Sequence, residues 1–106
     1  MDSRITKVLD YVENNLGQPL RLNKLAAIAC LSPSQFHRLF KSETGSTPFK
    51  FVEELKINKA YQRIIHENVP ISQLSVALGY QDYETFTRAF KKRFHLSPDD
   101  LRSVAD

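Results

Sequence analysis

A short pattern of residues occurs twice in this chain, 50 positions apart. Residues 36–41 read Phe-His-Arg-Leu-Phe-Lys, and residues 86–91 read Phe-Thr-Arg-Ala-Phe-Lys. The same offset pairs flanking positions: Ser32 with Asp82, and Pro48 with Pro98. Any two amphipathic helices would share apolar positions, but periodicity alone would not place Arg and Lys identically. The sequence therefore indicates that one structural unit is present twice.

Each copy is predicted to be a helix-turn-helix. A short helix over about 22–29 is followed at once by Ser32, Pro33 and Gln35, which read as an N-cap, a first helical residue and the partner of a capping box. One helix thus stops and another starts within about three residues, as in a helix-turn-helix. Upstream of the cap the offset between the copies is 49 instead of 50, since Leu25 pairs with Leu74. The turn of the second helix-turn-helix is therefore one residue longer than that of the first.

The fold class predicted for the whole chain is all-α, since strand signals are nearly absent. Seven helices are expected, at about 5–16, 22–29, 33–45, 49–66, 71–78, 83–94 and 98–104. The span 49–66 has no Gly or Pro and would be roughly 27 Å long at 1.5 Å per residue. We therefore expect a first helix-turn-helix unit over 1–47, a linker helix over 48–69 and a second unit over 70–106.

Composition limits the classes of protein that remain. The net charge is +3, and four basic residues lie within the six positions 88–93. Cys30, the single cysteine, excludes an intramolecular disulfide and is expected to be a small buried residue in the first turn. Residues 1–20 lack the apolar run of a signal peptide, and no stretch approaches a membrane span, so we expect a cytoplasmic protein without membrane contact.

The repeated helices should each present a polar, basic face opposite an apolar one. Helical spacing turns inward Phe36, Leu39 and Phe40 in the first copy, and Phe86, Ala89 and Phe90 in the second. It turns outward Ser34, His37, Arg38 and Lys41 in the first copy, and Glu84, Thr87, Arg88 and Lys91 in the second. Short polar groups with guanidinium and ammonium groups suit the base edges and phosphates of a DNA major groove.

The two copies together resemble one known family. Leu25-Ala26, Leu31-Ser32 and Phe36-x-Arg38-x-Phe40-Lys41 are similar to the first unit of the AraC/XylS family of bacterial transcription regulators. Its second unit is matched by Gly79-Tyr80-x-Asp82-x-x-x-Phe86-x-Arg88-x-Phe90-Lys91, then Ser97-Pro98 and Leu101-Arg102. The resemblance runs from about Ile5 to Arg102. The chain departs from the family at His95, where Gly is usual, and at Lys56, where Arg is common.

The resemblance implies that the exposed faces of the two recognition helices contact DNA. Carried over by position, the base-contacting residues are Ser34, His37, Arg38, Tyr83, Glu84, Thr87 and Arg88. Phosphate contacts are expected from Gln35, Lys41, Lys56, Lys91 and Lys92, although a solvated surface is an alternative for Lys92. Arg38 and Arg88 could instead form ion pairs with Glu43 and Glu84. Glu84 could accept from a cytosine amino group or favour the positive end of its helix.

The function predicted is sequence-specific binding of double-stranded DNA, with two recognition helices in successive major grooves, to regulate transcription. No enzymatic activity, cofactor or metal is expected, because the sequence shows no paired carboxylates, no nucleophile with a base and no metal-ligand spacing. Expected partners are DNA, RNA polymerase, and an effector or dimerisation domain outside this chain, in the nucleoid of the cytoplasm. The alternative function is a helical module whose basic face binds an acidic protein; salt-sensitive binding to duplex DNA separates the two.

Overall fold

The computed structural model describes residues 1–105, and this part of the chain contains seven helices and no strand. The helices are α1 (Ser3–Asn14), α2 (Leu22–Ile28), α3 (Pro33–Thr44), α4 (Pro48–His66), α5 (Ile71–Ala77), α6 (Tyr83–Phe94) and α7 (Pro98–Ala105). The predicted all-α class and the number of helices are confirmed. The first helix ends at Asn14, before the predicted Leu16, although Leu16 is buried as the apolar stripe requires.

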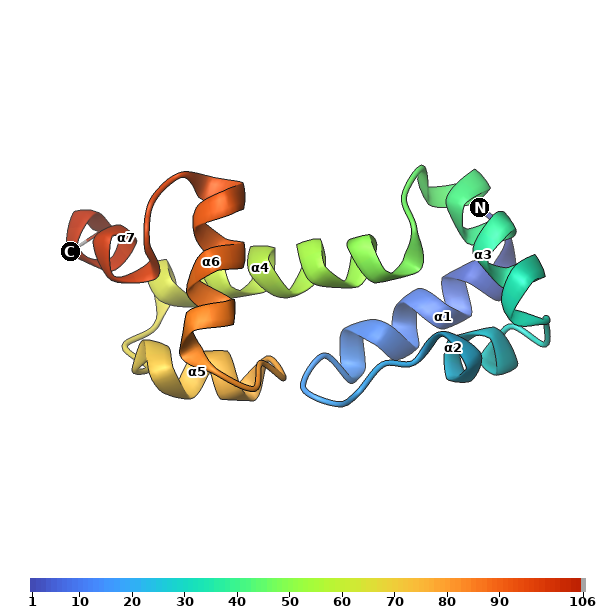
Figure 1. Ribbon diagram of the computed structural model, residues 1–106, viewed down its shortest axis with the longest axis horizontal. Helices are drawn as coiled ribbons and strands as arrows, with labels where there is room; N and C mark the ends of the chain where they lie inside the picture. Colours follow the sequence, from blue (N-terminus) through green and yellow to red (C-terminus); the bar gives the residue numbers. More distant parts are fainter. Residues whose placement is uncertain (106) are drawn as a thin grey trace. The chain divides into compact units, whose positions relative to one another are not determined.

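The chain divides into two compact units, Met1–Glu54 and a second that begins at Leu55. The first contains α1, α2, α3 and the start of α4; the second contains the rest of α4 with α5, α6 and α7 (Figure 1). The helix α4 is continuous over 19 residues and passes from the first unit into the second.

N-caps set the start of α3 and α6, the second helix of each helix-turn-helix. The backbone N–H of Gln35 donates to Ser32 Oγ (3.3 Å), and the backbone N–H of Ser32 donates to Gln35 Oε1 (3.4 Å). The predicted capping box of α3 is therefore present. At α6 the backbone N–H of Thr85 donates to Asp82 Oδ1 (2.7 Å). This bond stabilises the carboxylate and lowers the pKa of Asp82 below its ordinary value.

The turn between the two helices has the same hydrogen bonds in both units. In the first, the N–H groups of Cys30 and Leu31 donate to the carbonyls of Ala27 and Ala26 (3.0 Å each). In the second, Gly79 and Tyr80 donate in the same way to Val76 (2.9 Å) and Ser75 (3.0 Å). This is the Schellman pattern, which needs a left-handed residue after the helix. Cys30 (φ 58°) and Gly79 (φ 86°) supply it.

The expectation that Cys30 is buried is wrong: the residue is exposed. The turn needs its backbone in the left-handed region and does not enclose its side chain. The core beneath the turn is filled by Leu25, Ala26 and Ala29.

The helices α3 and α6 also each end on a left-handed residue, Gly45 (φ 78°) after α3 and His95 (φ 64°) after α6. Gly45 was the predicted stop for α3. Each unit therefore has two left-handed positions, one filled by glycine and one by a side-chain-bearing residue, and the order is reversed between the units.

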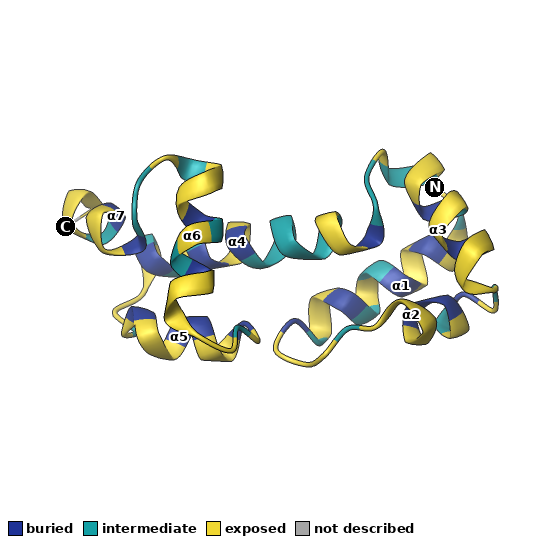
Figure 2. Ribbon diagram, in the orientation of Figure 1, coloured by how far each residue is buried: buried dark blue, intermediate teal, exposed yellow. Residues whose placement is uncertain are grey.

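The buried residues follow the repeat. Phe36 and Phe40 in the first unit, and Phe86 and Phe90 in the second, are at most 1% exposed, and the buried and exposed faces of α3 and α6 alternate (Figure 2). The repeat also extends to the supporting helix, which was not predicted: α1 buries Ile5, Val8 and Val12, and α4 buries Ile57, Ala60 and Ile64, at a constant offset of 52. The C-terminal part of α4 is therefore the supporting helix of the second unit, as α1 is of the first.

Candidate nucleic-acid interface

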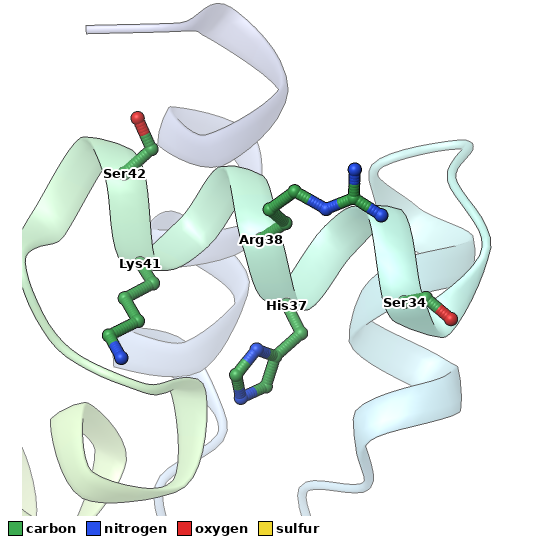
Figure 3. A pocket seen from close by; sticks show the side chains of 5 residues that line it. All are labelled: Ser34, His37, Arg38, Lys41 and Ser42. Carbon is green, nitrogen blue, oxygen red and sulfur yellow. The ribbon is translucent and has the colours of Figure 1, made fainter.

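The outward face of α3 carries an open hollow lined by polar side chains. The five lining residues all come from this helix, and all are exposed: Ser34, His37, Arg38, Lys41 and Ser42 (Figure 3). Four of them were predicted for the outward face. Ser42 was missed, although it lies one turn beyond Arg38 and could have been found from that spacing.

The opposite face of α3 fixes the orientation of this hollow. The rings of Phe36 and Phe40 pack 5.5 Å apart, and Phe40 makes an edge contact of 5.4 Å with Phe51 of α4. Because Phe36 and Phe40 are fully buried, α3 cannot rotate about its axis without exposing them. The polar side chains therefore project from a rigid element.

Arg38 of α3 does not form the ion pair with Glu43 that was considered from the sequence. Glu43 accepts a hydrogen bond from the backbone N–H of Asp2 (2.9 Å), and the described part of the chain contains no ion pair of Arg38. Arg38 and Lys41 thus leave a positive, solvent-accessible surface on α3.

The outward face of α6 differs from that of α3 in carrying an acid. Arg88 Nη2 lies 3.8 Å from Glu84 Oε1, with side chains 74% and 87% exposed. The ion pair considered from the sequence is therefore present, but it is long and solvated, and such pairs contribute little to stability.

Two other residues of α6 are partly engaged within the protein. Tyr83 Oη donates to Asp99 Oδ2 of α7 (2.7 Å), and burial, followed by this bond, raises the pKa of Tyr83. Thr87 is half-buried and its hydroxyl oxygen is enclosed, so the expectation that Thr87 points outward is only partly right. Tyr83 remains exposed along part of its ring.

The candidates for phosphate contacts lie in different environments. Lys41, Lys91 and Lys92 are exposed, whereas Gln35 is exposed but uses its carbonyl oxygen in the capping box. Lys56 is half-buried, with Nζ 5.6 Å from the centre of the Tyr80 ring.

One positive charge of the 88–93 cluster is directed back onto the protein. Arg93 Nε donates to Asn58 Oδ1 of α4 (2.9 Å), and its guanidinium lies 5.6 Å from the centre of the Phe94 ring. The cluster is therefore only partly available to a partner.

Residues 1–105 contain no group of three or more His, Cys, Asp or Glu side chains that could hold a metal ion. Over the same residues, no helix combines the length and apolar character that crossing a membrane would require.

Two helix-turn-helix units, each with a rigidly held second helix that carries exposed basic and polar side chains, define the class of helix-turn-helix DNA-binding domains. The family model described as "Helix-turn-helix domain" matches residues 25–103. Among relatives, the multiple antibiotic resistance protein MarA of Escherichia coli K12 is 33% identical over 98 residues, which cover 92% of this chain and 77% of MarA. The probable transcriptional regulator LumQ of Photobacterium leiognathi is 33% identical over 97 residues, 90% of this chain but only 39% of LumQ.

A solved structure of similar fold is that of a transcriptional regulator with an AraC-type DNA-binding domain from Chromobacterium violaceum. It matches with a TM-score of 0.89 and 27% identity, over 97% of this chain and 92% of that one. This chain belongs to the AraC-type family of helix-turn-helix transcription regulators.

Proposed function

We propose that the chain binds a specific sequence of double-stranded DNA with two recognition helices, α3 and α6, in successive major grooves, and thereby regulates transcription. The observation that carries the proposal is the duplicated outward face. Arg38 and Lys41 on α3 recur as Arg88 and Lys91 on α6, and all four are exposed on helices locked by buried phenylalanines.

The residues proposed to contact bases are Ser34, His37, Arg38, Tyr83, Glu84, Thr87 and Arg88. Arg38 and Arg88 are the strongest candidates, because a guanidinium forms two parallel bonds with a guanine edge. Gln35, Lys41, Lys56, Lys91 and Lys92 are proposed to contact phosphates, and of the four lysines Lys41, Lys91 and Lys92 are exposed.

The proposed division is a first unit over 1–47, a linker over 48–69 and a second unit over 70–106. The continuity of α4 supports it, because its 19 residues form an uninterrupted helix of roughly 28 Å. Recognition helices in successive major grooves lie about 34 Å apart, which a stiff connector can maintain and a flexible one cannot.

The proposal places the chain in the bacterial cytoplasm at the nucleoid, without enzymatic activity. RNA polymerase is the second partner proposed, and an effector or dimerisation domain would lie outside this chain. The relatives include both a protein little longer than the matched region and a much longer one, since the chain covers 77% of MarA but 39% of LumQ.

Selection from a pool of random duplexes tests the proposed function. The purified chain should enrich one site, bind it at least about 1,000-fold more tightly than random DNA, and lose affinity steeply as salt increases. Arg38→Ala and Arg88→Ala should each relax the preference at one position, at a cost of about 1–3 kcal/mol. Lys7→Ala removes an exposed charge from α1 and serves as the control. A chain that enriches no site, or binds an acidic protein without binding DNA, would contradict the proposal.

A further inference from the structure

The two recognition helices differ most at one pair of equivalent positions. Ser34 on α3 corresponds to Glu84 on α6 at the repeat offset of 50, and each is the second residue of its helix. One turn later both helices carry an arginine, Arg38 and Arg88. Glu84 is thus an acid on a face that is otherwise polar or basic, in a domain whose partner is a polyanion.

A carboxylate in this place weakens binding to any DNA, because phosphates repel it. It also limits which base edges the helix can approach. An ionised carboxylate only accepts hydrogen bonds, so it is left unpaired against the O6 and N7 acceptors of guanine or the O4 acceptor of thymine. Two amino groups donate in the major groove, N6 of adenine and N4 of cytosine. Adenine places the N7 acceptor beside its amino group, whereas the cytosine amino group is the donor that carboxylates usually read.

The N-cap of α6 does not involve Glu84. Asp82 already caps α6, through the bond from the Thr85 N–H to its carboxylate (2.7 Å). Within residues 1–105, the only partner of the Glu84 carboxylate is Arg88, at 3.8 Å, and both side chains are largely exposed. A role in binding therefore explains the acid better than a role in stability.

We propose that Glu84 is a specificity-determining residue, which accepts a hydrogen bond from a cytosine amino group in the half-site of α6. Arg88 lies one turn further along the same face, with Nη2 3.8 Å from the Glu84 carboxylate, so the two side chains would meet neighbouring bases. The first unit has Ser34 in this place, and a hydroxyl both donates and accepts, so α3 is less selective at the equivalent base. This inference rests on the proposed function.

The test compares sites selected from random duplexes by the full chain and by its Glu84→Ser, Glu84→Gln and Ser34→Glu variants. Glu84→Ser makes the start of α6 like that of α3. We expect it to lose the cytosine preference at one position, with discrimination there reduced by about 5- to 150-fold. Both Glu84 variants should bind random DNA more tightly than the unmodified chain does. Ser34→Glu should weaken binding to random DNA and restrict the equivalent position of the other half-site to cytosine.

The outcomes separate this inference from the proposed function. If the unmodified chain enriches no site, the proposed function fails, and the inference fails with it. If the chain enriches a site and both Glu84 variants enrich the same site with undiminished preference at every position, only the role of Glu84 is overturned. Thermal unfolding of each variant checks the helix-end explanation, since lowered stability with an unchanged site would overturn the inference in favour of that explanation.

Discussion

Single residues in the left-handed backbone region show how the two units differ in local strain. Gly45 ends α3 without strain, whereas His95 ends α6 with a side chain in a conformation that costs an ordinary residue about 1–2 kcal/mol. The family resemblance identified His95 as a departure from the usual glycine. The structure shows that the departure changes the residue but not the backbone conformation.

This strain predicts opposite effects at equivalent positions. Gly45→Ala should destabilise the protein by about 1 kcal/mol, although no atom lies within 4 Å of the added carbon, because the backbone at φ +78° disfavours a side chain. His95→Gly should stabilise it by about 0.5–1 kcal/mol, since relief of strain exceeds the extra entropy of the unfolded chain. Urea unfolding measures both; equal effects at the two positions would show that the strain argument is wrong.

The cap of α6 makes stability depend on pH. The N–H of Thr85 lowers the pKa of Asp82 in the folded protein, below the value of about 3.9 for an unfolded chain. The stabilisation is therefore complete above about pH 5 and is lost as the pH falls through the lowered pKa. Thermal unfolding between pH 6 and pH 2 should show a smaller acid-induced loss for Asp82→Asn, which keeps a capping oxygen without the charge.

Asp2 provides a common background in that comparison. Its pKa is lowered to about 2, chiefly by the hydrogen bond from the Arg4 side chain, and this effect is the same in both proteins. An acid-induced loss that is unchanged in Asp82→Asn would contradict a contribution from the α6 cap.

At the scale of helices, one arginine joins the C-terminal helix to the end of the connector. Arg102 of α7 donates to the carbonyl oxygens of Val69 (2.5 Å) and Glu67 (3.1 Å), in the loop between α4 and α5. The family pattern marked Arg102 but gave no reason for it. The guanidinium holds α7 and the loop together by satisfying two carbonyls that no helix uses.

Replacement of Arg102 should weaken the contact between α7 and the loop after α4. Arg102→Ala is expected to lower the stability of the protein by about 2 kcal/mol, since hydrogen bonds from a charged group are lost and carbonyls are left unpaired. Arg102→Lys should recover only part of the loss, because an ammonium group cannot reproduce the planar fork of two donors. Chemical denaturation measures the change, and equal stability of Arg102→Lys and the unmodified protein would rule out a role for the fork.

The helices and their caps could be predicted from the sequence because their signals are local. Ser32, Gln35 and Gly45 specify the start and end of α3 within a few positions, and the structure places them as expected. The conformation of Cys30 was missed because no glycine marks it, although its match to Gly79 at offset 49 contains the signal. The bond between Tyr83 and Asp99 joins two helices, and no local pattern reveals such a contact.

On the scale of the whole molecule, the central claim is that two equivalent units read DNA together. The basic cluster at 88–93 belongs to the second unit, and Arg93 there is held by Asn58. Lys91→Ala and Lys92→Ala should therefore each weaken binding to all duplexes alike and reduce the salt dependence by about one ion, without altering the selected site. Titration with duplex at several salt concentrations measures this, and a changed site preference would show that these lysines read bases.

A hydroxyl-radical footprint of the chain on its selected site tests the central claim most directly. Two protected patches are predicted, about 10 base pairs apart on one face of the duplex. Arg38→Ala should weaken protection of one patch, and Arg88→Ala protection of the other. A single short patch, or two patches that both respond to the same arginine, would contradict the account.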